Sequence, residues 1–139
     1  MTEADWLHRL DAAGWLAAAE TELDAGARRV AERRAAITHA RRAAGMALNA
    51  VLVAWTRSDP TLDPTAPWGR SYVDHLRMLA DGERGPLDAD APALAEAVLA
   101  TPLLAPALVS LGRRHADVSA TLAHARTLVD ACAAAIARL

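Results

Sequence analysis

The sequence predicts an all-α protein, a four- to five-helix up-and-down bundle with two long antiparallel helices at the N-terminus and a long helix at the C-terminus. Three observations lead to this fold class. About a quarter of the 139 residues are alanine, and all 15 basic residues are arginine, both strong helix formers. Apolar residues recur three and four positions apart over long stretches. No stretch alternates in the manner of a β-strand beyond background.

The first helix is expected near the N-terminus. Thr2 is a candidate N-cap, with Asp5 reaching back as in a capping box. Gly26 suits a C-terminal cap in the left-handed region, so the helix should end there. The helical spacing places these residues on its apolar face: Trp6, Leu10, Ala13, Ala17 and Leu23.

The second helix, expected from about Arg28 to Arg57, carries the most distinctive pattern in the chain. Its half from Ala43 to Thr56 has no charged residue, so it should be buried on more than one side. Two opposite apolar stripes run along it, and we expect the first to face the first helix. The second needs another partner, either a later helix of this chain or the same helix of a second copy. The first stripe is Ile37, Ala44, Leu48, Val51 and Trp55, and the second is His39, Ala43, Met46, Ala50 and Val53.

The remainder of the chain reads as shorter elements within one domain, 1–139. A proline-rich loop, 57–70, separates the first helix pair from them. Ser71 with Asp74 predicts the capped start of a short helix that Gly82 ends. A fourth helix is expected over 93–100, just after a proline. The last helix, from about residue 112 to the end, has a seam of Val118, Leu122, Ala125, Val129, Cys132 and Ile136.

Composition excludes several classes of function. A net charge of -2 and a pI near 6.2 give no global attraction to nucleic acid or to an anionic membrane. The one cysteine, Cys132, cannot form an internal disulfide, and no His, Cys or carboxylate group has ligand-like spacing, so we expect no metal and no cofactor. Nothing reads as a signal peptide or as a membrane span of ~18 apolar residues. A cytoplasmic protein without membrane contact is therefore expected.

Arg70 and His75 are the strongest candidates for catalysis. If Ser71 caps the helix, the Arg70 side chain lies just outside it and could converge with His75. Histidine can transfer the proton of a ribose hydroxyl, and arginine can neutralise charge on the phosphorane oxygens. The alternative, more frequent by chance, is that Arg70 pairs with Asp74 and His75 is an ordinary helix residue.

Other polar residues suggest binding or structure. Arg113, Arg114 and His115 precede the last helix, where free amides favour an anion; a solvated basic edge is the alternative. Asn49 is interpreted as a structural residue, bonded across a helix pair or setting register. His39 is interpreted as a packed or interface histidine. Arginines gather early in the second helix, with acids near enough to neutralise several: Arg28, Arg29, Arg33, Arg34, Arg41 and Arg42, against Glu20, Glu22, Asp24 and Glu32.

Residues 15–52 resemble the opening helix pair of HEPN domains, which are small α-helical bundles of bacteria and archaea. The segment from His39 to Val51 is similar to the family pattern His-Ala-x-x-Ala-Ala-x-x-Ala-Leu-x-Ala-Leu. The resemblance covers about the first 55 residues and implies a helical bundle that often dimerises. Family ribonucleases carry an Arg followed after four to six residues by His, as Arg70 and His75 are spaced. Ser71 stands where many active members have Asn, Asp or His, and the Tyr of toxin-type members is absent.

Three functional hypotheses follow. The first is a non-catalytic HEPN-like module, a homodimer that binds a partner protein, a nucleotide or RNA; the resemblance adds a nucleotidyltransferase as a partner. The second is a metal-independent, toxin-type endoribonuclease with an antitoxin partner, in which Arg70 and His75 of two copies line one cleft. The third is a purely structural helical scaffold.

Overall fold

The fold is organised around one long helix, α2 (Arg33–Ser58), against which the other helices pack. The computed structural model describes residues 6–63, 68, 71–104 and 115–139. In these residues a short 3-10 turn, η1 (Leu7–Arg9), precedes α1 (Ala12–Arg28), and no strand is found. The later helices are α3 (Tyr72–Ala80), α4 (Ala91–Ala100) and α5 (Ala116–Ala137). The predicted all-α bundle is confirmed.

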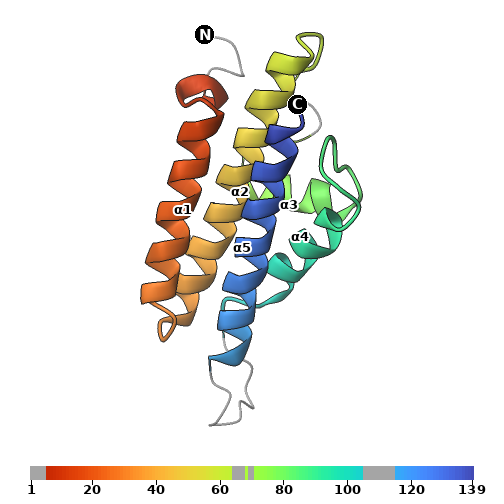
Figure 1. The fold of residues 1–139 in the computed structure, drawn as a ribbon. Helices are drawn as coiled ribbons and strands as arrows, with labels where there is room; N and C mark the ends of the chain where they lie inside the picture. The colour runs from red at the N-terminus through yellow and green to blue at the C-terminus, as the bar shows by residue number, and fades with distance from the viewer. Residues whose placement is uncertain (1–5, 64–67, 69–70, 105–114) are drawn as a thin grey trace.

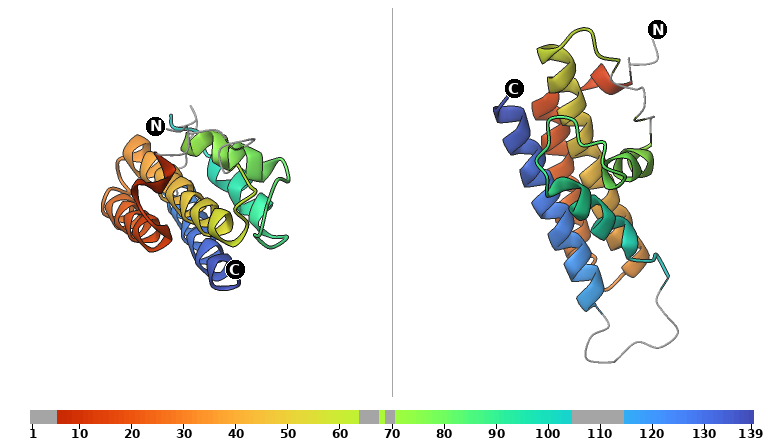
Figure 2. Two further views of the ribbon diagram at one scale, coloured as in Figure 1. Left: turned by 90° about the horizontal axis from the view of Figure 1, so that it is seen from above. Right: turned by 90° about the vertical axis from the view of Figure 1, so that its right-hand side faces the viewer.

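The helices form a three-helix core with a smaller layer beside it. α1 and α2 are antiparallel, as expected, whereas α5 runs in the same direction as α2 (Figures 1 and 2). Within the three-helix core, α2 and α5 are therefore a parallel pair. α3 and α4 lie on the side of α2 away from α1 (Figure 2); both contact α2, they contact each other, and α4 also contacts α5.

Most of the charge-free half of α2 is buried on all sides by this chain, and only its last three residues are half-buried. Every residue from Ala43 to Val53 is buried. The expectation of burial on more than one side is confirmed, and helices of the same chain supply the cover. A second copy is not needed to cover α2.

The prediction of which stripe faces which helix was wrong. Ile37, of the first stripe, packs with Val118 of α5, and Trp55 lies against Gly85 in the α3–α4 connection. His39, of the second stripe, lies against Gly26 of α1. The period places residues on a face, but the partner of each face depends on how the whole chain packs.

Both predicted ends of the first helix changed. Thr2 and Asp5 lie outside the described residues; Asp11 caps α1, and its Oδ1 accepts a hydrogen bond of 2.7 Å from the Gly14 amide. Gly26 does not end the helix, which continues to Arg28. A Cβ on Gly26 would lie 2.8 Å from a Leu122 methyl group of α5. This glycine therefore allows α1 and α5 to pack closely.

The shorter elements begin and end close to the predicted positions. The Ser71 hydroxyl accepts a hydrogen bond of 3.0 Å from the Asp74 amide, so the predicted cap is present. Gly82 has a φ of 106°, which favours glycine after α3. Along α5, Val118, Ala125, Val129 and Cys132 are buried and the other two seam residues are half-buried, which confirms the seam. None of the described helices is long and apolar enough to cross a membrane.

Gly45 lets α3 approach the middle of α2. A Cβ at this position would lie 2.3 Å from the Tyr72 Cβ and 2.4 Å from a ring carbon. Tyr72 is the first residue of α3 and is a lining residue of two cavities. The absence of a side chain on Gly45 therefore sets the position of α3.

Replacing this glycine tests the close approach. Gly45→Ala should lower the free energy of unfolding by about 1–3 kcal/mol, because overpacking against a backbone-proximal atom outweighs the helix propensity gained. Chemical denaturation would measure it. Gly14→Ala is the control, since its nearest contacts are side-chain atoms 3.1 Å or more away. Equal stability of Gly45→Ala and wild type would contradict the packing described.

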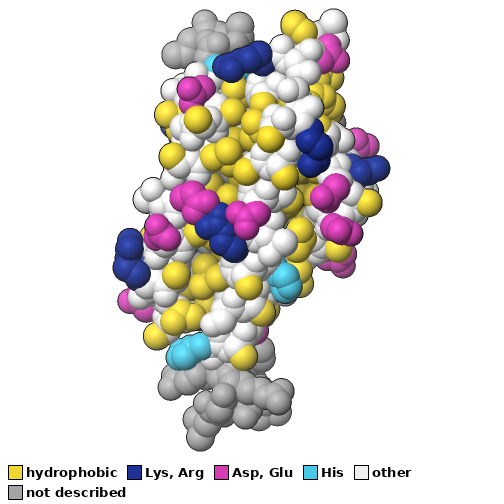
Figure 3. All heavy atoms as spheres, in the orientation of Figure 1, with side chains coloured by type: hydrophobic (Ala, Val, Ile, Leu, Met, Phe, Trp, Pro, Cys, Tyr) yellow, Lys and Arg dark blue, Asp and Glu magenta, His cyan; other side chains and the backbone are white. Residues whose placement is uncertain are grey.

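An exposed ion pair joins α1 to α5. Arg126 Nη1 donates to Glu20 Oε2 over 2.6 Å, its Nη2 bonds the other carboxylate oxygen, and Asp130 lies 2.9 Å from Nη2. Acidic and basic side chains meet on this face of the molecule (Figure 3). The hydrogen bond from Arg126 lowers the pKa of Glu20, against a smaller effect of burial.

This ion pair should stabilise the fold only above the range where Glu20 protonates. Because the native pKa is lowered, the contribution is complete above the unfolded value of 4.5 and is lost as the pH falls through the native pKa. Glu20→Gln should cost less than about 1 kcal/mol at pH 7, as expected for exposed pairs, and still less at pH 3. Thermal melts at both pH values would measure this. Glu96→Gln, an exposed acid of α4 without an ion pair in the described residues, should show no such difference.

Candidate functional site

His75 is enclosed by indole rings. It lies in the first turns of α3 with 0% of its surface exposed. The Trp6 ring stacks on it with centroids 6.1 Å apart, and the Trp68 ring meets it edge-on at 6.4 Å. The imidazole could reach a phosphodiester only if one of these rings moved away. This environment is typical of a core histidine.

The other predicted site residues are not brought together within the described structure. Arg70, Arg113 and Arg114 lie outside the described residues. His115 is half-buried at the N-cap position of α5 but makes no side-chain capping bond. Ser71 is exposed, and its hydroxyl both caps α3 and lies at the edge of two cavities.

Two arginines of α2 are committed to structure. Arg33 Nε donates to the Pro102 carbonyl over 3.0 Å, and its Nη1 lies 2.7 Å from Asp117 of α5. Arg41 donates to the Leu99 and Thr101 carbonyls over 3.3 and 2.9 Å, so it caps the end of α4. Burial lowers the pKa of Arg41, and nearby Arg77 lowers it further. These side chains fasten α4 to α2.

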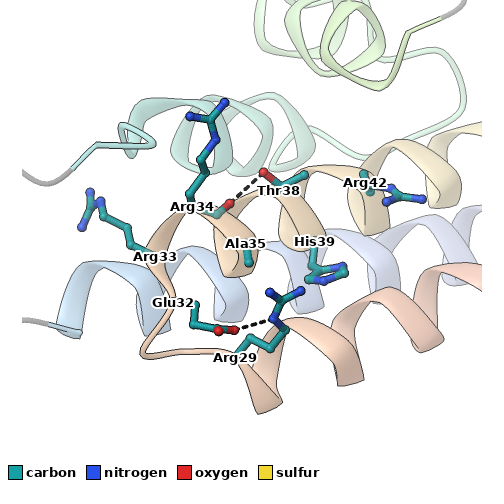
Figure 4. Close-up of a pocket in the computed structure, with 8 residues that line it drawn as sticks. All are labelled: Arg29, Glu32, Arg33, Arg34, Ala35, Thr38, His39 and Arg42. Atoms are coloured by element: carbon teal, nitrogen blue, oxygen red, sulfur yellow. Dashed lines mark hydrogen bonds and ion pairs between the residues drawn. The ribbon is translucent and has the colours of Figure 1, made fainter.

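Four arginines, Arg33 among them, line an open cavity of about 640 Å³ at the start of α2, here called the arginine cavity (Figure 4). The guanidinium groups of Arg33 and Arg34 point away from those of Arg29 and Arg42 (Figure 4). The cavity therefore offers several separated cationic groups. Its lining is Arg29, Glu32, Arg33, Arg34, Ala35, Thr38, His39 and Arg42.

Carboxylates neutralise part of this charge. Glu32 pairs with Arg29, and Glu22 lies 2.5 Å from His39 Nδ1 and 3.1 Å from Arg42. The expected neutralisation is confirmed for these two acids, whereas Glu20 turns to α5. The Arg34 guanidinium has no partner among the described residues. Arg34 is thus the cation of this cavity most available to an external anion.

A second cavity, of about 410 Å³, was not anticipated from the sequence. Among its lining residues is Asn49, which is fully buried, and neither amide atom has a hydrogen-bond partner in the described part of the chain. The expected bond of Asn49 across a helix pair is therefore not formed. A buried unsatisfied amide costs about 1–3 kcal/mol, so this position requires an explanation. We call this space the Asn49 cavity; its lining is Trp6, Arg9, Trp15, Asn49, Ser71 and Tyr72.

Metal-binding and thiol chemistry find no support in the described residues. No group of three or more His, Cys, Asp or Glu side chains there could hold a metal ion. Cys132 is buried in the core, and this burial raises the pKa of its thiol. A protonated, enclosed thiol is a poor nucleophile.

Comparison with known proteins identifies no relative: no protein-family model, curated protein or solved structure matches the chain. The resemblance to HEPN domains therefore stays a prediction.

The burial of His75 can be tested by chemical modification. Diethyl pyrocarbonate should modify the exposed His8 and His124 rapidly in the folded protein and His75 only after local or global opening. Peptide mapping by mass spectrometry would give the three rates, with urea-unfolded protein as the control in which they converge. Equal rates for His75 and His8 in the folded protein would show that the Trp6 and Trp68 rings do not enclose His75 in solution.

Proposed function

We propose that this protein is a non-catalytic, HEPN-like helical module that binds single-stranded RNA through its phosphates at the arginine cavity. The observation that carries the proposal is the set of three arginines, Arg29, Arg34 and Arg42, around one open cavity, with the Arg34 guanidinium lacking a partner among the described residues. Guanidinium groups bind phosphate oxygens through paired N–H donors.

The direction of the side chains supports a polymer over a small anion. The guanidinium groups of Arg34 and Arg42 point in different directions (Figure 4), an arrangement that suits successive phosphates of a strand better than a single phosphate. Because Glu22 and Glu32 already hold Arg42 and Arg29, a strand must compete with these acids, and weak, salt-sensitive binding is expected.

Binding is favoured over cleavage because of His75. A general base must come within hydrogen-bonding reach of the substrate hydroxyl, and the imidazole is enclosed by Trp6 and Trp68. The ribonuclease, with its toxin role and antitoxin partner, remains the alternative. The homodimer, the nucleotidyltransferase partner and the plain scaffold also stay predictions.

The proposal predicts a specific loss of RNA binding. Arg34→Ala with Arg42→Ala should weaken binding of a fluorescein-labelled single-stranded RNA several-fold at low salt, because phosphate contacts are lost. The slope of log affinity against log salt should also fall, by about 0.7 per contact removed. Fluorescence anisotropy over a salt series would measure both quantities.

The matched control is Arg57→Ala, which removes an exposed arginine from the last turn of the same helix. It should leave affinity nearly unchanged. Affinity equal in the double variant and the wild type would refute the site. Equal binding of heparin and RNA would reduce the interaction to general attraction of polyanions, and binding of AMP as tight as that of RNA would favour a nucleotide ligand.

A further inference from the structure

Asn49 lies midway along α2 with an amide that the described protein does not use. It is 0% exposed, and both Oδ1 and Nδ2 lack a hydrogen-bond partner. An amide presents one acceptor and two donor hydrogens side by side. Nearly all buried polar groups in folded proteins are bonded, so a molecule outside the chain is a natural partner for this one.

The walls of the Asn49 cavity are rich in aromatic side chains. Aromatic side chains come from three segments: Trp6 just before η1, Trp15 of α1 and Tyr72 of α3. Trp15 is held in place, since its Nε1 donates to the Leu7 carbonyl over 2.8 Å. Flat rings stack favourably on such faces. The volume of about 410 Å³ lies within the range of small-molecule sites.

The cavity reaches the surface beside a positive charge. Arg9 and Ser71, two of its lining residues, are exposed. The Arg9 guanidinium carbon lies 5.1 Å from the Trp15 ring centroid, a cation–π distance that keeps the charge near the opening. An anionic substituent on a bound ring would meet this arginine.

From these three observations we propose that the Asn49 cavity binds a small, flat aromatic molecule that carries neighbouring hydrogen-bond donor and acceptor groups on one edge. An aromatic carboxamide has such an edge, and so does an amino-substituted nitrogen heterocycle. The Asn49 amide, which has no exposed surface while the cavity is empty, turns toward this edge to pair with it, and the aromatic side chains pack against the ring. The site is separate from the arginine cavity, with no lining residue in common.

Matched pairs of probes test the edge. In calorimetric titrations of the full chain, benzamide should bind at least about tenfold more tightly than acetophenone, which has the same shape but no amide donor. Adenosine against purine riboside makes the same comparison for an amino-substituted heterocycle. The two comparisons together show whether the carboxamide or the heterocycle is the better ligand. 3-Carbamoylbenzoate should exceed benzamide in affinity, and Arg9→Ala should remove that excess.

Asn49→Leu tests the residue. The leucine side chain has the same branching, and the adjacent cavity can accommodate its larger methyl groups, so the variant should melt at the same temperature as the wild type or higher, and it should lose the preference for benzamide over acetophenone. The control is Thr121→Val, another fully enclosed polar residue, whose hydroxyl lies 2.5 Å from Thr101 Oγ1 and donates to the Asp117 carbonyl. It should melt lower than the wild type.

Three outcomes would overturn the proposal. One is the absence of binding by every probe at millimolar concentration, which would mean that water or nothing occupies the cavity. Another is an equal preference for benzamide in Asn49→Leu and wild type. The third is a marked fall in the melting temperature of Asn49→Leu, which would show a native bond to the amide. The anisotropy measurement of RNA binding tests the arginine cavity separately, because Asn49→Leu changes none of the residues that line that cavity.

Discussion

The burial of the charge-free half of α2 is the constraint on which the rest of the structure depends. Ala43 to Val53 is apolar around nearly the whole helix, so packing on one side alone would leave apolar surface in water. α1, α5 and α3 all pack against this helix. Small residues make the close approach feasible: Gly45 admits Tyr72, and Gly26 of α1 admits Leu122. The arrangement of helices follows from covering α2.

This central helix also divides the arginines by role. Arg33 and Arg41 donate hydrogen bonds to carbonyl groups at the end of α4, so these guanidinium groups are engaged within the fold. Arg34 and Arg42, each the next residue along the same helix, remain exposed. The sequence does not predict this division, because both pairs consist of arginines with the same spacing along the helix. It matters for function, since only the second pair can meet an external phosphate.

The limits of sequence reasoning are clearest at Asn49 and His75. Both stood out in the sequence, Asn49 as a polar residue in an apolar run and His75 through its spacing from Arg70. The expectation that Asn49 bonds across a helix pair was wrong, because no donor or acceptor of the described chain reaches it. His75 is enclosed by Trp6, which is far from it in the sequence, and by Trp68, which is close to it in the sequence. Only a folded arrangement shows that the three rings meet.

The sequence by itself determined the helical content, the cap at Ser71, the burial of α2 and the α5 seam, because these depend on residues within a few turns of one another. The tertiary structure alone decided that Ile37 faces α5 and His39 faces α1, that Gly26 is a packing residue, and that an unpartnered amide borders an aromatic cavity. Helical periodicity sets which residues share a face. The neighbour of that face is set by long-range packing of the whole chain, which no local pattern encodes.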